Sequence, residues 1–361
     1  MTAMLSYGTE KFFAEDVFLD EIDEDEVLVK IKAVGICHTD IASTESIYPF
    51  SYPVLLGHEG AGIVEKVGKN VINVSPGDHV VLVYASCGKC DHCIQGMPYI
   101  CDEFYCLNTK GVSKHNQKKL ALANGEKVSN FFGQSSFAEY SIVNQNSVVK
   151  VDKELPLDYL GPLACGLMTG FGSVLEKLQP KKNESIAVFG CGAVGLSSII
   201  ASKIAGCKEI IAIDVSNKKL EFAKQFGATH VINSENESVK DMISSYLTKG
   251  VHYAVESTGH PAVLQEALEI TRLSGKIVVL SAVKSGTKIE LDYKSIQSER
   301  SLIGTIMGSV NPHLFIPRLI EFYKNGQLPL EKLITFYRLK DINEAIQDIK
   351  NGKVIKAVLK I

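Results

Sequence analysis

The first third of the chain alternates apolar and polar residues in short segments, which predicts β-strands. EVLVKIKAVGI (26–36) and GAGIVEKVG (60–68) alternate in this way, and PGDHVVLV (76–83) follows a turn signal. Gly, Pro and Asp interrupt the segments up to about residue 150, as they do at turns between strands. We therefore expect a β-rich domain here.

From about residue 165 the pattern changes to short apolar runs that alternate with helical stretches. The runs that predict strands are SIAVFG (185–190), EIIAIDV (209–215) and GKIVVLSAV (275–283). The stretches with helical spacing are KKLEFAKQFGA (218–228) and PAVLQEALEITRL (261–273). This alternation predicts βαβ units and a parallel sheet covered on both faces. The regular alternation of strands and helices stops in the last part of the chain, where we expect a helix near 312–325 and a strand at 354–361.

Composition and charge narrow the class of protein. The chain has 361 residues, 45% of them apolar and 22% charged, and domains usually span about 100 to 200 residues, so two domains are expected. The net charge of −3 gives no sign of a basic surface for nucleic acid or an anionic membrane. No signal peptide is evident, and no apolar run reaches membrane-spanning length. We expect neither nucleic acid nor a membrane as a partner.

The nine cysteines are the most informative part of the composition. An odd number, with four of them within fifteen residues, does not resemble the disulfide framework of a secreted protein. We therefore expect a cytoplasmic, reducing location, where clustered cysteines indicate metal binding.

Four cysteines share one loop, CGKCDHCIQGMPYIC, and predict a closed metal site: Cys87, Cys90, Cys93 and Cys101. Four thiolates can surround one tetrahedral Zn²⁺ and leave no position for a substrate. An iron–sulfur cluster, which also takes four thiolates, is an alternative, as are free thiols, although exposed thiols would be prone to oxidation. His92 could compete as a ligand, and Cys106 is expected to be a spare thiol.

The segment GCGAVG (190–195) predicts a dinucleotide site because it follows a strand and opens a helix. Gly190 permits the tight turn, Gly192 lets a pyrophosphate approach the backbone, and Gly195 lets helix and strand pack closely. Asp214, at the end of the next strand, would bind the adenosine ribose hydroxyls and repel a 2′-phosphate, which favours NAD over NADP. The lysines at 218–219 weigh slightly against NAD, and a Gly-rich turn without a ligand is the alternative.

Three separate segments carry metal-ligand residue types: GICHTD (35–40), GHEG (57–60) and GPLACG (161–166). A set of two cysteines and one histidine, completed by water, would be a catalytic zinc site. No spacing rule joins Cys37, His58 and Cys165, however, and a lone cysteine at a strand end is more often a small core residue. The residues alone therefore do not decide whether Cys37, His58 and Cys165 form a common metal site.

These motifs in this order resemble the zinc-dependent medium-chain alcohol dehydrogenases over nearly the whole chain. FFGQSSFAEY (131–140), ESTG (256–259) and FIPRLIEFYKNGQLP (315–329) are similar to segments of the bacterial benzyl (aryl) alcohol dehydrogenases. The resemblance implies an α/β fold with two domains. A GroES-like β-rich catalytic domain would comprise residues 1–166 and 306–361, and a Rossmann domain with a doubly wound parallel sheet, residues 167–305, would be inserted into it.

The resemblance also implies two zinc ions per chain and NAD as cofactor. Cys37, His58 and Cys165 would hold the catalytic zinc, and the four clustered cysteines the structural zinc. Glu59 would lie behind the catalytic metal, and Asp40 would orient the His58 imidazole.

Six positions match cofactor-binding positions of the family. Those near the adenosine half are Val194, Asp214 and Lys219, those at the pyrophosphate are His38 and Lys356, and Thr169 matches a position beside the nicotinamide. Many relatives have Arg where His38 stands, so we expect weaker NADH binding than in an Arg variant.

The implied reaction is reversible hydride transfer from a primary alcohol to NAD⁺. Zinc would lower the pKa of the alcohol hydroxyl, and Thr39 would accept its proton and pass it toward the cofactor ribose. Several relatives carry a His where Ala42 stands, so the relay would end at the ribose and water.

Four aromatic residues fall near positions that line the family's alcohol pocket: Tyr48, Tyr84, Phe131 and Phe132. Such a pocket suits an aromatic ring, which favours a benzyl-type alcohol and its aldehyde, although each residue could instead belong to the core. Aliphatic, terpenoid or glutathione-adduct alcohols are the alternatives, and a non-catalytic family member is a further one. The family forms homodimers or homotetramers, and RSLIGTIMG (300–308) is a candidate interface strand.

Overall fold

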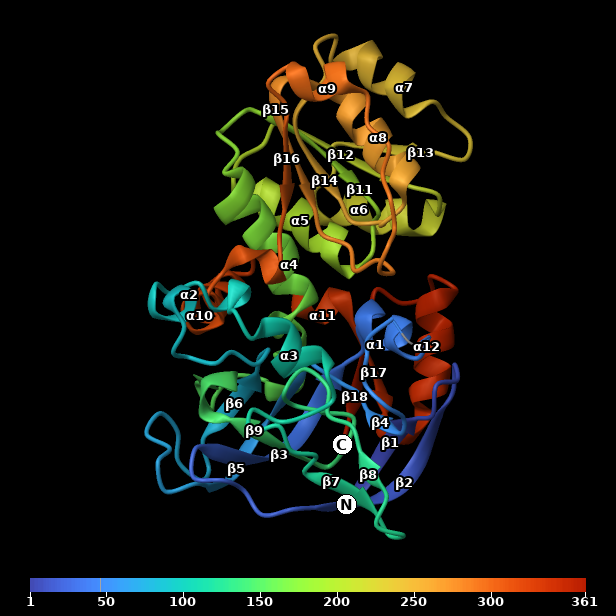
Figure 1. Cartoon of the computed structure of the whole chain (residues 1–361). Coiled ribbons are helices and arrows are strands. Elements are labelled where there is room, and N and C mark those ends of the chain that lie inside the picture. Colours follow the sequence, from blue (N-terminus) through green and yellow to red (C-terminus); the bar gives the residue numbers. More distant parts are fainter. Residues whose placement is uncertain (46) are drawn as a thin grey trace. The chain divides into compact units, whose positions relative to one another are not determined.

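The chain forms two compact units in the computed structural model, which describes residues 1–45 and 47–361. The first unit comprises Met1–Cys165, Asn311–Lys324 and Pro329–Ile361, and the second comprises Gly166–Val310 and Asn325–Leu328 (Figure 1). The first unit is therefore discontinuous in sequence. The domain bounds expected from the sequence, 1–166 with 306–361 and 167–305, stay a prediction.

The first unit contains two sheets whose strands pair mostly antiparallel. One has the order β4-β1-β2-β7-β8, with bounds Val54–Leu55, Thr2–Ser6, Phe12–Leu19, Leu120–Leu122 and Lys127–Val128. The other has the order β10-β6-β5-β3-β18-β17, with bounds Val148–Val151, His79–Leu82, Gly60–Val67, Glu26–Gly35, Lys356–Lys360 and Ile334–Arg338, and β9 (Tyr140–Asn144) also pairs with β3. The alternating segments at 26–36 and 60–68 thus become the antiparallel neighbours β3 and β5.

The end of the chain returns to the first unit. Strand β18 lies between β3 and β17, with Val358 opposite Gly35 and Leu359 opposite Val34 (Figure 1). Its first four residues are buried, as expected for an interior strand. The strand predicted at 354–361 is therefore confirmed.

Six helices cover parts of the first unit. They are α1 (His38–Ser43), α2 (Asp91–Ile94), α3 (Phe104–Thr109), α10 (Pro312–Lys324), α11 (Leu330–Leu333) and α12 (Ile342–Lys350). Helix α12 buries Ile342, Ala345 and Ile346, the i, i+3, i+4 face of an amphipathic helix, and packs on β17 and β18. The helix expected near 312–325 is α10.

The second unit contains a fully parallel sheet of order β13-β12-β11-β14-β15-β16. The bounds are His230–Asn233, Glu209–Asp214, Ser185–Phe189, Val251–Glu256, Thr271–Val279 and Ser301–Gly304. In order of sequence this is 3-2-1-4-5-6, the Rossmann arrangement, in which ligands bind where the order reverses. That point lies between β11 and β14, so the predicted α/β class with a doubly wound sheet is confirmed.

Helices lie on both faces of this sheet. Those that contact the sheet are α5 (Ala193–Ile204), α6 (Asn217–Phe226), α7 (Val239–Tyr246) and α8 (Pro261–Ile270). The unit also contains α4 (Gly166–Gly172), which packs on α5, and α9 (Tyr293–Gln297). Helices α5 and α6 contact each other, as do α7 and α8, and Figure 1 shows the two pairs on opposite sides of the sheet. The helix predicted over 261–273 is too long, because Thr271 pairs with Val251 and starts β15.

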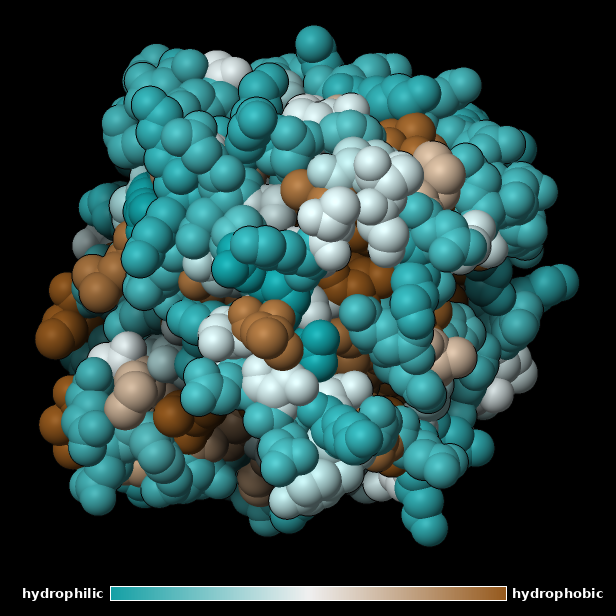
Figure 2. All heavy atoms as spheres, turned by 90° about the horizontal axis from the view of Figure 1, so that it is seen from above, coloured by the Kyte–Doolittle hydropathy of each residue, from teal (hydrophilic) through white to brown (hydrophobic). Residues whose placement is uncertain are grey.

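The described surface carries several exposed large hydrophobic side chains, among them Ile72, Tyr293 and Leu314. In the view of Figure 2 the surface is mostly hydrophilic, and hydrophobic atoms form small separate groups. Among the described residues, no helix combines the length and the apolar character needed to cross a membrane.

Candidate metal and cofactor sites

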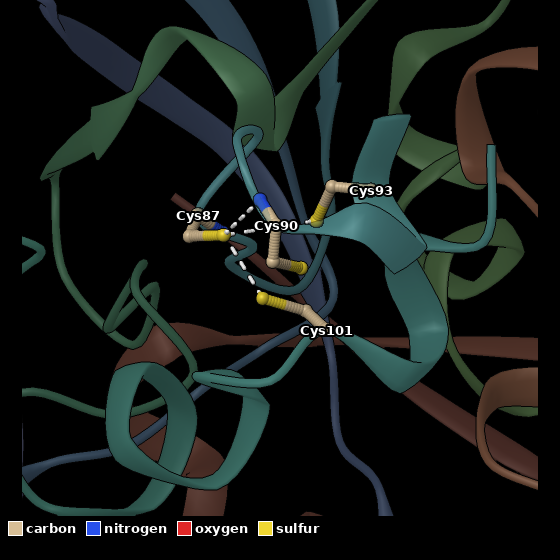
Figure 3. Close-up of side chains that lie close together, drawn as sticks. All are labelled: Cys87, Cys90, Cys93 and Cys101. Atoms are coloured by element: carbon tan, nitrogen blue, oxygen red, sulfur yellow. Dashed lines mark hydrogen bonds between the residues drawn. The ribbon is translucent and has the colours of Figure 1, made fainter. Parts of the chain in front are cut away.

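The four clustered cysteines converge on one point, as Figure 3 shows. Cys87 precedes α2, Cys90 caps its N-terminus, Cys93 lies within it and Cys101 ends the loop. Their sulfur atoms all lie within 4.8 Å of one another, and the sulfur atoms of Cys87 and Cys93 are 3.9 Å apart. Zn–S bonds of about 2.3 Å give a tetrahedral edge of about 3.8 Å. The cluster therefore fits a closed four-thiolate zinc site.

The surroundings of the cluster favour the four cysteines as the metal ligands over a ligand set that includes His92. The His92 Nδ1 atom lies 2.9 Å from Asp102, with His92 half-buried and Asp102 exposed, whereas Cys87 and Cys101 are buried. Backbone hydrogen bonds lower the pKa of Cys90 to about 6, while burial raises the pKa of Cys93 to about 12. A bound cation is therefore needed before all four can be thiolates.

A second group forms where three distant segments of the first unit meet. Cys37 follows β3, His58 precedes β5, and Cys165 follows the turn Gly161–Ala164. The two sulfur atoms are 3.8 Å apart, and His58 Nε2 lies 3.3 Å from the Cys165 sulfur. Tetrahedral zinc gives S–S and N–S edges of about 3.8 and 3.6 Å. Three such donors fit a zinc ion, and a Glu59 carboxylate oxygen lies within 4.8 Å of the other donor atoms, so the fourth position could be taken by water, substrate or this carboxylate.

Asp40 holds this second group in place. Its Oδ1 lies 2.8 Å from His58 Nδ1, and its Oδ2 accepts the Cys37 N–H at 2.9 Å. A carboxylate on Nδ1 leaves Nε2 free to bind a metal. Burial lowers the pKa of His58, but the charge and hydrogen bond of Asp40 outweigh it and raise that pKa. The hydrogen bond between the two thiols lowers the pKa of Cys37 well below its ordinary value and raises that of Cys165, so one thiolate is favoured at this site before a metal binds.

Glu59 and Lys356 form a buried ion pair beside these donors. The Lys356 Nζ lies 2.6 Å from both carboxylate oxygens and donates to the Ile36 carbonyl at 2.9 Å. Burial raises the pKa of Glu59 to about 7, although Lys356 acts in the opposite direction. A Cβ on Gly35 would overlap the Glu59 carboxylate, so Gly is required there. Lys356 is almost fully buried, so little of its side chain is accessible to a pyrophosphate. Its role at the pyrophosphate therefore stays a proposal.

Thr39 and His38 lie at the first turn of α1. The Thr39 hydroxyl is 3.7 Å from the Cys37 sulfur, so it borders the second donor group. His38 is exposed, which leaves its imidazole accessible to a ligand.

Two buried aromatic rings, Phe131 and Phe132, contact His58. The Phe132 ring lies 4.8 Å from the imidazole, tilted by 33°, and Phe131 meets it edge-on at 5.5 Å. Tyr48 lies 6.1 Å from Phe131. Tyr84 packs against Phe104 at 5.4 Å, and Phe104 in turn lies 6.5 Å from Phe132.

Two rings of this aromatic group were not among the predicted pocket residues. Phe50 lies 5.9 Å from Phe131, and Phe104 lies 6.5 Å from Phe132. Phe104 follows Cys101 by three residues, and that spacing was the only available signal. Nothing in the sequence marks Phe50.

The glycine-rich turn of the second unit has the geometry that its motif predicts. Gly190 has φ +88°, and a Cβ on Gly195 would overlap the Gly190 carbonyl oxygen. A Cβ on Gly192 would meet nothing within 4 Å, so the backbone there is open to a pyrophosphate. Asp214 accepts the Cys191 N–H at 2.7 Å and the Ser216 N–H at 2.9 Å. This carboxylate therefore stands beside the turn, at the end of β12.

The other predicted cofactor residues lie on helices. Val194 lies in α5, Lys219 in α6 and Thr169 in α4. Val194 and Lys219 are partly exposed, whereas Thr169 is buried. Their contacts with a cofactor stay a prediction.

The comparisons with known proteins agree with this geometry. Residues 23–153 match the alcohol dehydrogenase GroES-like domain, and residues 193–325 match the zinc-binding dehydrogenase family. The chain is 36% identical to the S-(hydroxymethyl)glutathione dehydrogenase of Saccharomyces cerevisiae over 99% of this chain and 95% of that protein. It is 34% identical to the geraniol dehydrogenase of Castellaniella defragrans over 93% and 90%.

Solved structures show the same likeness. The benzyl alcohol dehydrogenase of Acinetobacter calcoaceticus is 39% identical with a TM-score of 0.95, covering 100% of this chain and 99% of that one. An alcohol dehydrogenase zinc-binding domain protein of Burkholderia ambifaria is 41% identical with a TM-score of 0.96, covering 100% and 98%. The chain therefore belongs to the zinc-dependent alcohol dehydrogenases, with a GroES-like domain, an NAD-binding Rossmann domain and a cysteine cluster that fits a structural zinc site.

Proposed function

We propose that this protein oxidises primary aromatic, benzyl-type alcohols to aldehydes with NAD⁺, reversibly. The observation that carries the proposal is the group of aromatic rings around His58, with Phe131 and Phe132 within 5.5 Å of the imidazole. Aromatic walls favour a flat, apolar substrate group. The similarity to the Acinetobacter benzyl alcohol dehydrogenase supports the same substrate class.

The catalytic metal ligands in this proposal are Cys37, His58 and Cys165. A zinc ion held there supplies Lewis-acid chemistry that lowers the pKa of an alcohol hydroxyl. Thr39, beside Cys37, would accept the substrate proton at its Oγ1 while its own hydroxyl proton passes on, so the residue stays neutral. Ala42 offers no proton acceptor, so the released proton would pass to a hydroxyl of a bound cofactor or to water. Glu59 remains behind the donors with its charge balanced by Lys356.

The cofactor in this proposal binds along the turn after β11. Gly190, Gly192 and Gly195 hold the pyrophosphate at the N-terminus of α5, where the helix dipole favours an anion. Asp214 binds the adenosine ribose. The remaining cofactor contacts are assigned to Val194, Lys219, Thr169, His38 and Lys356.

A substrate panel tests the substrate class. Turnover of NAD⁺ is followed by NADH absorbance with benzyl alcohol, cinnamyl alcohol, geraniol, ethanol and S-(hydroxymethyl)glutathione. We expect the highest kcat/KM with the aromatic alcohols. An equal kcat/KM with ethanol, or a higher one with geraniol or the glutathione adduct, contradicts the aromatic assignment.

Two variants and a metal analysis test the assigned ligands. Cys37→Ala should abolish turnover and reduce the zinc content from two ions per chain to one. Cys207→Ala, which removes a partly exposed thiol of the second unit, is the matched control and should retain both ions and full activity. One ion or none in the wild-type protein contradicts the proposed function.

We also propose a cytoplasmic location and a homodimeric or homotetrameric state. All nine cysteines are free, as suits a reducing compartment. Among the described strands, β16 pairs with β15 alone, so it offers an edge at residues 300–308 for a second copy. Cell fractionation and light scattering measure the two properties.

A further inference from the structure

One asparagine joins both ends of the cysteine-rich loop, defined here as residues 87–101. The Asn108 Oδ1 accepts the N–H of Ala85, two residues before Cys87, at 2.9 Å. Its Nδ2 donates to the Ala85 carbonyl at 2.9 Å and to the Phe104 carbonyl at 2.7 Å. The Phe104 N–H in turn donates to the Cys101 carbonyl at 2.8 Å. Asn108 is buried, so it fixes the chain entering the loop against the helix leaving it.

The same asparagine holds a second turn through its backbone. The Asn108 carbonyl accepts the N–H of Phe132 at 2.9 Å. Phe132 has φ +49°, a left-handed conformation that costs a bulky residue about 1 kcal/mol or more. The next residue, Gly133, has φ +62°, and a Cβ there would lie 2.6 Å from the Ala85 Cβ. The turn at residues 132–133 is thus packed closely against Ala85, the residue whose backbone Asn108 bonds.

This turn carries the ring that lies on His58. The Phe132 ring is 4.8 Å from the imidazole on one side, and Phe131 meets it at 5.5 Å. Asp40 holds the imidazole through Nδ1 at 2.8 Å and Nε2 faces the Cys165 sulfur at 3.3 Å, but these two contacts at the ring edge still allow the ring to rotate about the line that joins them. The two phenylalanines restrict that rotation.

We propose that the cysteine-rich loop positions the His58 imidazole through Asn108 and Phe132, so that the metal site of the four cysteines strengthens metal binding at Cys37, His58 and Cys165. This inference rests on the two metal sites of the proposed function. Asn108 and Phe132 are positioning residues in it. Partners outside the ligand set of a metal typically change its affinity by about 10- to 100-fold when they are mutated.

The test compares zinc release from Asn108→Ala with release from a matched control, Asn144→Ala. Asn144 is also a buried asparagine of the first unit whose side chain bonds backbone groups, here of Asp25 and Asn146. None of its hydrogen bonds leads to His58. Zinc that leaves the holoenzyme is captured by an excess of chromogenic chelator, and the absorbance records the kinetic phases of release. The phase that is lost in Cys165→Ala, which lacks one proposed ligand, is the one that belongs to the catalytic site.

We expect the catalytic-site phase to be about tenfold faster in Asn108→Ala and within about twofold of wild type in Asn144→Ala. A merely structural role would lower the unfolding temperature of both variants and leave the catalytic-site phase equal in the two. Equal rates therefore overturn the inference. Because the chain contains no tryptophan, circular dichroism measures the unfolding temperature.

A glycine pair keeps the test decisive if Asn108→Ala fails to fold. Gly133→Ala places a methyl group 2.6 Å from the Ala85 Cβ at φ +62°, whereas Gly125→Ala has a similar φ of +84° and meets nothing within 4 Å. Both carry the same kind of backbone strain, but only Gly133→Ala displaces the turn. Faster release in Gly133→Ala alone supports the inference, and equal release overturns it.

The release assay separates this inference from the proposed function. Two zinc ions, faster release in Asn108→Ala and no preference for aromatic alcohols would overturn the substrate class and support the inference. A wild-type protein with one zinc ion would overturn both.

Discussion

Replacing Lys356 by methionine removes the counter-charge of a buried carboxylate. Glu59 is fully buried, Lys356 is 3% exposed, and Nζ lies 2.6 Å from both carboxylate oxygens. Methionine retains most of the length of the side chain but leaves the carboxylate unpaired. Breaking a buried pair in this way costs about 3–5 kcal/mol. For a unit of this size each kcal/mol lowers Tm by about 2–4 °C, so we expect a loss of roughly 6–20 °C.

Two further measurements identify the cause of that loss. The double variant Lys356→Met/Glu59→Gln removes both charges and should recover most of the lost stability, because a neutral pair needs no counter-charge. The single variant should lose less at about pH 6 than at about pH 8. Burial already raises the pKa of Glu59 to about 7, and Lys356 lowers it, so without the lysine the pKa rises further and the carboxylate takes up a proton as the pH falls.

Thermal scans followed by circular dichroism, at one scan rate for all variants, provide the comparison. A Tm of Lys356→Met within about 2 °C of wild type would show that the carboxylate is solvated or already neutral. A double variant no more stable than the single one would show that lost packing, and not charge, causes the effect. Either result refutes the reasoning.

Three other predictions concern the cofactor and the acid stability of the first unit. His38→Arg should tighten NADH binding severalfold in a fluorescence titration, because Arg binds phosphate through two hydrogen bonds; unchanged affinity argues against a pyrophosphate contact. Gly195→Ala should abolish NADH binding with both zinc ions retained, because its Cβ overlaps the Gly190 carbonyl oxygen; normal binding argues against the turn. His115, Lys114 and Asn144 outweigh burial and lower the pKa of Asp25 to about 2, so wild type should lose stability from pH ~4 to pH ~2; an equal loss in Asp25→Asn contradicts this.

Local patterns account for the parts of the molecule that the sequence predicted well. The four cysteines of the loop lie within fifteen residues, so their spacing alone indicated a common site. GCGAVG lies between β11 and α5, and the apolar runs around it form the parallel sheet. The cysteine spacing and the glycine motif both involve residues that are close together in the chain, so the sequence alone was enough to predict them.

Features that form between residues far apart in the chain could not be predicted from local sequence patterns. Cys37, His58 and Cys165 come together only because β3 and β5 pair and the chain then returns, and their grouping in the sequence rested on a family resemblance. The ends of elements also depend on pairing, as at Thr271, where a helical pattern gives way to a strand. Neither Asn108 nor Phe50 had a signal, because their importance lies in the partners that the fold supplies.

The position of β18 has a consequence for the synthesis of the protein. This strand lies inside the sheet, between β3 and β17, and it carries Lys356. Residues 356–360 must therefore be synthesised before the first unit can close and before Glu59 receives its counter-charge. The second unit is complete earlier in the chain, so it can fold while the first unit is still open, although domains synthesised first usually fold first. During that interval β3 lacks one of its neighbours in the sheet, and a variant without β18 would leave this edge of β3 unpaired.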